Sequence, residues 1–419
     1  MIMLKKWIVC TNKNIDKRSA LWNMFSSILG SAQSAVFLFV VTHVCDTVYA
    51  GIFSIATTLG YQIVTIGNYG MRNYQATDVR QKYKFREYLL SRYITSLFML
   101  LFLISYIVIK EYNIEKAMII FVFGIFKAID VIEDVFHGEF QRYNRLDIGA
   151  ICMSIRYVIS FAVFAIILVI TENLLVACIW ETLTSICVFI YLTYEVVKPK
   201  KVLKINIKNA LIQAKLLLNE CFPLFLGGFL YLYICNAPKY AIDNCLSQES
   251  QAYFAILFMP VFIVNLLSGF IYRPLLTRMA ICWVEKRNKE FVHIISRQVV
   301  FIILATVLGI VGAYFIGVYL LSWIYGVNIN VYRDALVILM LGGGFAAITG
   351  YFMNVLTIMR LQKVMLIGYC IVAVISIIIS NLFVVNWGIL GASMLYVILM
   401  LLLTMYFVMV ILIHKNYRK

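Results

Sequence analysis

Apolar residues fill about twelve long stretches of this chain, and short polar gaps separate each stretch from the next. Each stretch holds roughly 20 residues, the length of helix that crosses a hydrocarbon layer about 30 Å thick. The alternating pattern of a membrane β-barrel is absent, so each stretch predicts a helix and the chain an all-α, polytopic membrane protein. The predicted spans cover residues 19–42, 47–69, 88–109, 114–136, 148–170, 174–197, 216–234, 252–271, 299–323, 335–359, 364–385 and 389–413.

Lysine and arginine occur mainly in alternate gaps between the predicted spans. They gather at both termini and in the even-numbered gaps, whereas the odd-numbered gaps hold only Lys110, Lys116, Lys239 and Arg333. Basic residues beside a span are retained on the cytoplasmic side during insertion. The pattern therefore predicts an even number of crossings, with both termini in the cytoplasm.

The composition agrees with a membrane protein, because 63% of the residues are hydrophobic, only 13% are charged and the mean hydropathy is +0.91. Too few polar residues remain to cover a soluble globule of this size. The net charge of +16 follows from the topology and favours anionic lipid, so we expect the bilayer and no nucleic acid as partner. The ten cysteines contain no Cys-x-x-Cys pair and the four histidines are isolated, so no metal site is predicted.

A basic segment near the middle of the chain leaves six predicted spans on either side. Secondary transporters commonly consist of two such halves. We therefore expect an N-terminal lobe over residues 1–197, a cytoplasmic linker with an interfacial helix over 198–215, and a C-terminal lobe over 216–419. The second and eighth spans support this repeat, because each is followed by an arginine at its cytoplasmic exit, Arg72 and Arg273. Plain interfacial anchoring also explains arginines at such positions.

Several ionisable side chains fall inside the predicted spans, where each costs about 2.5–3.5 kcal/mol to insert. At about 100° per residue, the charged residues of the fourth span share one face of the helix, about 120° wide. That face must look into the helix bundle or into a wet cavity. The fifth span contributes Arg156, the sixth contributes Glu181, and the fourth contributes Lys127, Asp130, Glu133, Asp134 and His137.

Lys127 and Arg156 both fall near the middle of the membrane, whereas the acidic residues of the fourth span lie closer to the cytoplasm. Two cations at that depth suit a substrate that carries phosphate, because Arg156 offers a bidentate fork and Lys127 a point charge. The alternative is that these cations and the neighbouring acids neutralise one another between packed helices. The residues alone leave both interpretations open.

Signatures of several enzyme classes are missing from the chain. It has no Asp-x-Asp pair of a nucleotide-sugar glycosyltransferase, no Gly-x-x-x-x-Gly-Lys phosphate loop, and no gap long enough for a folded external domain. A membrane-embedded polysaccharide polymerase or transferase would need a catalytic acid or histidine beside an external loop, and Glu181 alone does not supply one. We therefore expect a transporter and no enzyme, with no cofactor apart from a coupling ion.

Two short segments and the overall architecture carry a resemblance to a known family. The segments are residues 69–78 (YGMRNYQATD), after the second span, and residues 387–393 (WGILGAS), at the start of the last span. With the basic linker between two sets of six spans, the whole chain resembles the polysaccharide and O-antigen repeat-unit flippases. These belong to the multidrug/oligosaccharidyl-lipid/polysaccharide (MOP) exporter superfamily.

The resemblance implies two six-helix lobes around a cationic cavity, in the plasma (inner) membrane of a bacterium. Flippases of this family move undecaprenyl-diphosphate-linked oligosaccharide to the outer leaflet by alternating access, where polymerase machinery assembles O-antigen or capsule. Lys127 and Arg156 would line the cavity, and Arg72 and Arg273 would meet the diphosphate at the cytoplasmic entrance. Four acids would carry a coupling proton or sodium ion, or hold the cations ready: Asp130, Glu133, Asp134 and Glu181.

The nearest alternative is a cation-coupled multidrug exporter of the same superfamily. That function would favour an acidic residue inside the first span, and residues 19–42 contain none. A major-facilitator transporter is disfavoured, because the second gap lacks the Gly-x-x-x-Asp-Arg-x-Gly-Arg pattern. A membrane-embedded polymerase or transferase is the remaining alternative.

Overall fold

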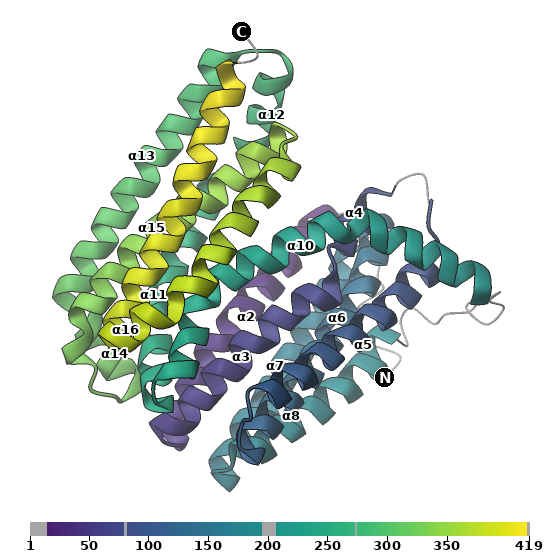
Figure 1. The fold of residues 1–419 in the computed structure, drawn as a ribbon. Helices are drawn as coiled ribbons and strands as arrows, with labels where there is room; N and C mark the ends of the chain where they lie inside the picture. Colours follow the sequence, from purple (N-terminus) through teal and green to yellow (C-terminus); the bar gives the residue numbers. More distant parts are fainter. Residues whose placement is uncertain (1–14, 79–81, 195–206, 273–274, 417–419) are drawn as a thin grey trace. The chain divides into compact units, whose positions relative to one another are not determined.

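The computed structural model describes residues 15–78, 82–194, 207–272 and 275–416, and the regular elements in these ranges are helices (Figure 1). No strand occurs within them. The prediction of an all-α chain is therefore confirmed, and each of the twelve predicted spans lies on a helix.

The first six predicted spans correspond to successive helices, and a short helix lies between the second and the third. Side chains just before three of these helices accept a hydrogen bond from the first turn: Asp46 from the Tyr49 amide at 3.0 Å, Asn113 at 2.9 Å and Asn173 at 3.1 Å. Such caps stop one helix from running into the next. The elements are α2 (Ile15–Val44), α3 (Thr47–Asn68), α4 (Met71–Thr77), α5 (Phe85–Ile109), α6 (Ile114–Arg142), α7 (Leu146–Thr171), α8 (Leu174–Phe189) and the π-helix η1 (Ile190–Tyr194).

The other six predicted spans lie on fewer, longer helical elements. One of these, α10, joins the described end of the predicted linker to the seventh span without a break, and residues 195–206 lie outside the described residues. The elements are α10 (Ile207–Cys245), α11 (Gln248–Tyr272), α12 (Leu276–Val284), α13 (Asn288–Gly312), η3 (Ala313–Gly317), α14 (Val318–Tyr325), η4 (Asn330–Tyr332), α15 (Arg333–Ile358) and α16 (Gln362–Asn416).

Within the described ranges, nine helical stretches are long and apolar enough to cross a membrane. One of them, Gln362–His414, contains both of the last two predicted spans. Helix α6 is not among the nine, because charged side chains interrupt its apolar sequence. Charged side chains inside a membrane helix are commonly functional, so α6 is the first candidate to carry a functional site.

The chain forms two compact units, Met1–Phe229 and Leu230–Lys419, which divide inside α10. In the first unit α6 packs against α3, α5, α7 and α8, so its polar face is enclosed by other helices. In the second unit α15 packs against α11, α13 and α16. The division into lobes at residues 197 and 216 stays a prediction.

Three consecutive glycines let α15 approach three other helices. A Cβ atom would lie 2.5 Å from Tyr396 at Gly342 and 2.5 Å from Thr306 at Gly344, and 3.1 Å from Val261 at Gly343. These neighbours belong to α16, α13 and α11. The glycines of the tenth span therefore serve helix packing, as small residues commonly do between membrane helices.

Segment 387–393, which carries part of the family resemblance, has a local structural explanation in α16. Gly388 has φ 55° and ψ −135°, a conformation that favours glycine, and it separates the two spans that α16 contains. One turn later, a Cβ at Gly391 would collide with the carbonyl oxygen of Phe383. Both glycines are therefore needed for the reversal between the last two spans.

We expect Gly391→Ala to lower the free energy of unfolding by about 1–3 kcal/mol, because the added methyl meets backbone that no rotamer change can move. Thermal unfolding of the purified protein in detergent measures this. Gly312→Ala is the matched control, since a Cβ there meets nothing within 4 Å. Equal unfolding midpoints for the two variants would contradict the packing argument.

Candidate functional site

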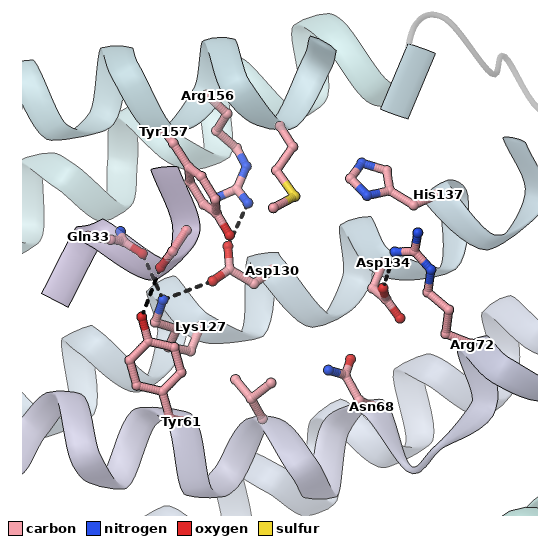
Figure 2. A pocket seen from close by; sticks show the side chains of 13 residues that line it. Gln33, Tyr61, Asn68, Arg72, Lys127, Asp130, Asp134, His137, Arg156 and Tyr157 are labelled. Atoms are coloured by element: carbon pink, nitrogen blue, oxygen red, sulfur yellow. Dashed lines mark hydrogen bonds and ion pairs between the residues drawn. The ribbon is translucent and has the colours of Figure 1, made fainter. Parts of the chain in front are cut away.

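A cavity of about 210 Å³ lies inside the first unit, where the polar face of α6 meets four neighbouring helices (Figure 2). Four of the charged side chains predicted on that face line it. The remaining wall comes from α2, α3, α4 and α7. The lining residues are Gly30, Gln33, Tyr61, Val64, Asn68, Arg72, Lys127, Asp130, Asp134, His137, Met153, Arg156 and Tyr157.

Lys127 lies at one end of this cavity, with 1% of its surface exposed. Its Nζ donates to Oδ2 of Asp130 at 3.0 Å and to Oε1 of Gln33 at 3.1 Å. It also lies 4.6 Å from the centre of the Tyr61 ring, a cation–π distance. Gly60 leaves room for this side chain, since a Cβ there would lie 3.2 Å from Cγ of Lys127.

An aromatic cluster closes the cavity beyond Lys127, toward the start of α6. The Phe123 ring lies 5.3 Å from Nζ of Lys127 and packs edge to face on Phe53 at 5.6 Å. Phe53 in turn contacts Phe37 at 5.7 Å and Phe164 at 5.8 Å. These rings are fully or almost fully buried, so they form an apolar wall beside Lys127.

Arg156 on α7 is held by side chains of α6 and α8. It donates through Nε to Oε2 of Glu133 at 2.8 Å, and through its terminal nitrogens to Oδ1 of Asp130 at 2.5 Å and to Oγ of Ser185 at 2.7 Å. Asp130 therefore bridges Lys127 and Arg156. Figure 2 shows the three side chains converging at one end of the cavity.

Glu133 lies behind this bridge and does not line the cavity. Its second oxygen, Oε1, accepts a hydrogen bond from Oγ1 of Thr193 at 2.9 Å and lies 3.8 Å from Nε2 of His137. Thr193 belongs to the π-helix η1, a kind of element often found at functional sites. With 1% of its surface exposed, Glu133 serves to hold Arg156.

Asp134 organises the other end of the cavity. Its Oδ1 accepts from Arg72 at 2.6 Å and its Oδ2 from Arg92 at 2.9 Å. Arg92 is fully buried and also donates to the carbonyl oxygen of Gly67 at 2.8 Å and to Oδ1 of Asn68 at 3.1 Å. It thereby satisfies a carbonyl at the end of α3 that has no partner within the helix.

A short left-handed turn between α3 and α4 places Arg72 beside the cavity. Tyr69 has φ 49° and Gly70 has φ 68°. The Tyr69 ring stacks on Phe225 at 4.4 Å, which supports a conformation that is uncommon outside glycine. The arginine of segment 69–78 thus points back toward Asp134 on α6, as Figure 2 shows.

A second predicted site residue, Glu181, also does not line the cavity. Glu181 on α8 is fully buried, and neither of its carboxylate oxygens has a hydrogen-bond partner among the described residues. Arg273 lies outside the described residues. Within the described ranges, no group of three or more His, Cys, Asp and Glu side chains is arranged to hold a metal ion.

The sequence reasoning missed Arg92 and the neutral residues of the cavity. Arg92 follows the cations of the second gap closely in the sequence, although position 92 already falls inside the predicted span 88–109. That position was the available signal. Tyr61, Tyr157, Gln33 and Asn68 gave none, because the chain has 27 tyrosines and many neutral polar residues in its spans.

Asp78 fixes the loop that follows α4. Its carboxylate accepts hydrogen bonds from the amides of Lys82 at 2.9 Å and Tyr83 at 3.1 Å, and from the Tyr88 hydroxyl at 3.1 Å. Burial acts to raise the pKa of Asp78, but these hydrogen bonds outweigh it and hold the pKa below its usual value. The folded state therefore favours the ionised carboxylate.

Asp78→Asn is expected to lower the free energy of unfolding by about 1–2 kcal/mol at pH 7. Because the folded pKa lies below the unfolded one, this stability is present above about pH 4 and is lost as the pH falls through the folded pKa. Thermal unfolding of both proteins between pH 7 and acid pH measures the difference. Glu111→Gln removes an exposed carboxylate and should change little; a pH-independent Asp78→Asn effect would argue against the ionised form.

The structure of the chain is similar to solved structures of MOP-superfamily transporters. The lipid II flippase MurJ in an inward closed conformation gives a TM-score of 0.71 at 14% identity, covering 94% of this chain and 87% of MurJ. An inward-facing multidrug resistance MATE transporter gives 0.59 at 12% identity, covering 96% and 94%. A MOP-superfamily transporter from Pyrococcus furiosus gives 0.55 at 11% identity, covering 99% and 97%. The chain has the MOP fold, as the sequence resemblance implied.

The chain is also similar in sequence to a protein of polysaccharide biosynthesis. The capsular polysaccharide biosynthesis protein CapF of Staphylococcus aureus is 22% identical over 283 residues, which are 66% of this chain and 69% of CapF. No family model matches the chain.

Proposed function

We propose that this chain, a multi-pass membrane protein with the MOP fold, is a flippase for undecaprenyl-diphosphate-linked oligosaccharide. It would move repeat units of O-antigen or capsule from the cytoplasmic to the outer leaflet. The observation that carries the proposal is the cation excess around one intramembrane cavity. Four buried or half-buried cations, Lys127, Arg156, Arg72 and Arg92, gather around two cavity carboxylates and Glu133.

A cavity of this charge suits an anionic group that must enter the membrane. A diphosphate with a lipid on one side and a sugar on the other carries two negative charges, which are too costly to bury without cations. Arginine and lysine side chains that line a cavity can supply these cations and donate hydrogen bonds to the phosphate oxygens. The names of two similar proteins, a lipid II flippase and a capsular polysaccharide biosynthesis protein, support the same substrate class.

The neutral polar lining suits an uncharged part of the same substrate. Gln33, Tyr61, Asn68 and Tyr157 present amide and hydroxyl groups to the cavity. Such groups hydrogen-bond sugar hydroxyls without selecting one sugar. The proposed alternating access would expose this lining to each side of the membrane in turn and release the repeat unit to a polymerase.

We also propose a coupling ion, a proton or a sodium ion, for the acidic residues. Asp130 and Asp134 line the cavity, and Glu181 is a buried carboxyl without a hydrogen-bond partner in the described residues. The rate of substrate translocation in proteoliposomes, measured under an imposed pH gradient or an imposed sodium gradient, distinguishes the two ions. A rate that changes with neither gradient would show that the acids do not bind a coupling ion.

A multidrug exporter is the competing function, and the cavity disfavours it. Many drugs exported by cation coupling are themselves cations, and such a ligand would meet Lys127, Arg72 and Arg156 in the cavity lining. Like charges placed together in a low-dielectric cavity repel strongly. The charge of the cavity therefore favours an anionic substrate.

Mass spectrometry of lipid-linked glycans in a strain that lacks this gene tests the proposal. We expect complete repeat units on undecaprenyl diphosphate to accumulate on the cytoplasmic leaflet while surface polysaccharide disappears. The parent gene on a plasmid should restore the polymer. Full-length polymer together with altered drug sensitivity would overturn the flippase and favour the exporter.

A further inference from the structure

Asp130 and Asp134 form two similar ion-pair clusters, one above the other on α6. Each carboxylate binds two cations, one through each oxygen: Asp130 binds Lys127 at 3.0 Å and Arg156 at 2.5 Å, and Asp134 binds Arg72 at 2.6 Å and Arg92 at 2.9 Å. Four residues of helix separate the two aspartates, a rise of about 6 Å. The cavity thus has two clusters, which we name by their depth in the membrane. The inner cluster at Asp130 lies deeper, and the outer cluster at Asp134 lies nearer the predicted cytoplasmic side.

One cation of each cluster is fixed by several further contacts. Arg156 also binds Glu133 and Ser185. Arg92 also binds the Gly67 carbonyl and the Asn68 side chain. Both side chains are 99–100% buried, and either arginine would give up several hydrogen bonds if it turned to a bulky anion.

The other cation of each cluster is held more lightly. Arg72 has one hydrogen-bond partner among the described residues, Asp134, and 29% of its side chain is exposed. Lys127 has two, Asp130 and Gln33, and its flexible chain ends in a rotatable ammonium at the edge of the cavity. Lys127 is as buried as Arg156 and also faces the rings of Tyr61, Phe123 and Phe126, but it has fewer hydrogen-bond partners than Arg156. Arg72 and Lys127 are therefore the cations that give up fewer hydrogen bonds when an anion enters the cavity.

The shared carboxylate lowers the cost of releasing such a cation. Breaking an isolated buried ion pair is expensive, because it leaves one charge without compensation. Here Asp130 keeps Arg156 when Lys127 leaves, and Asp134 keeps Arg92 when Arg72 leaves. Each cluster can therefore give one cation to a ligand without leaving a bare carboxylate.

We propose that the two clusters are successive stations for the diphosphate of the substrate. Arg72 of the outer cluster receives the diphosphate first, and Lys127 of the inner cluster receives it one helical turn deeper. Arg156 and Arg92 are positioning residues that hold the aspartates and do not touch the substrate. This assignment rests on the proposed function, and it changes the predicted role of Arg156 from binding to positioning.

The test uses the purified full-length protein in lipid nanodiscs with farnesyl diphosphate as the probe. Farnesol reports binding of the lipid tail alone, and inorganic pyrophosphate as competitor reports recognition of the free anion. Lys127→Gln and Arg72→Gln should each weaken binding about tenfold or more and keep the parent's unfolding midpoint. Arg142→Gln is the matched control, since it removes a cation paired on α6 with Glu139 outside the cavity lining.

The positioning residues should give the opposite result. Arg156→Gln and Arg92→Gln should lower the unfolding midpoint, and removal of the stranded charge in Arg156→Gln/Glu133→Gln should restore it with binding near the parent level. Farnesyl diphosphate binding no tighter than farnesol in the parent would overturn the proposed function itself. Normal binding by the parent, but lost binding in a stable Arg156→Gln/Glu133→Gln variant, would overturn the two stations alone.

Discussion

Lys127→Ala should abolish surface polysaccharide while the protein still reaches the membrane at its normal level. The side chain is the last cation before the aromatic wall, and its loss removes the inner positive charge available to the substrate. Stability should change little, because Asp130 remains paired with Arg156. Complementation of a deletion strain, with immunoblots of surface polymer and of the protein, measures both effects; we expect at least about a tenfold loss of polymer.

Two further variants serve as controls for Lys127→Ala. Lys127→Arg keeps the charge and should restore part of the activity. Lys116→Ala removes another cation of α6, near its start and outside the cavity lining, and should leave polymer unchanged. Normal polymer in Lys127→Ala at normal protein level would refute the role of this cavity in binding the diphosphate.

Arg156→Met should destabilise the protein by about 3–5 kcal/mol, the largest stability effect that we expect from a single change in the cavity. The substitution strands Glu133, which is 99% buried, and removes one of the two cations on Asp130. The membrane level and the thermal unfolding midpoint should both fall. Adding Glu133→Gln removes the stranded charge and should recover most of the midpoint.

A different outcome for Arg156 would be equally informative. If Arg156→Met folds like the parent and still loses transport, then the arginine contacts the substrate, as the sequence analysis proposed. If it folds and transports normally, then neither binding nor positioning depends on it. Purification yield, unfolding midpoint and surface polymer, measured on the same variant, separate these results.

The membrane helices could be predicted from the sequence because one physical requirement determines them. A span must be long and apolar, and every predicted stretch lies on a helix, including the two that share α16. The polar face of α6 was equally readable, since Lys127, Asp130 and Asp134 recur at helical spacing and do line one cavity. Local sequence was sufficient to predict those features that depend on one helix alone.

The parts that depended on other helices could not be predicted in the same way. Arg92 lies less than two helical turns from Arg86, and its burial and its contact with Asp134 depend on the neighbouring helices. Glu133 and Asp134 are adjacent on α6, yet one holds Arg156 behind the cavity and the other faces Arg72. Glu181 looked equivalent to them in sequence, but α8 places it outside the cavity lining. Pairing of charges is a property of the packed bundle.

The three glycines of α15 limit which sequence changes this protein can tolerate. Each missing side chain accommodates a different neighbour, on α16, α11 or α13, so a shift of one helix that relieves one substitution does nothing for the other two. A saturation mutational scan should therefore show three adjacent intolerant positions at Gly342, Gly343 and Gly344. Gly312, which has open space around it, should accept alanine.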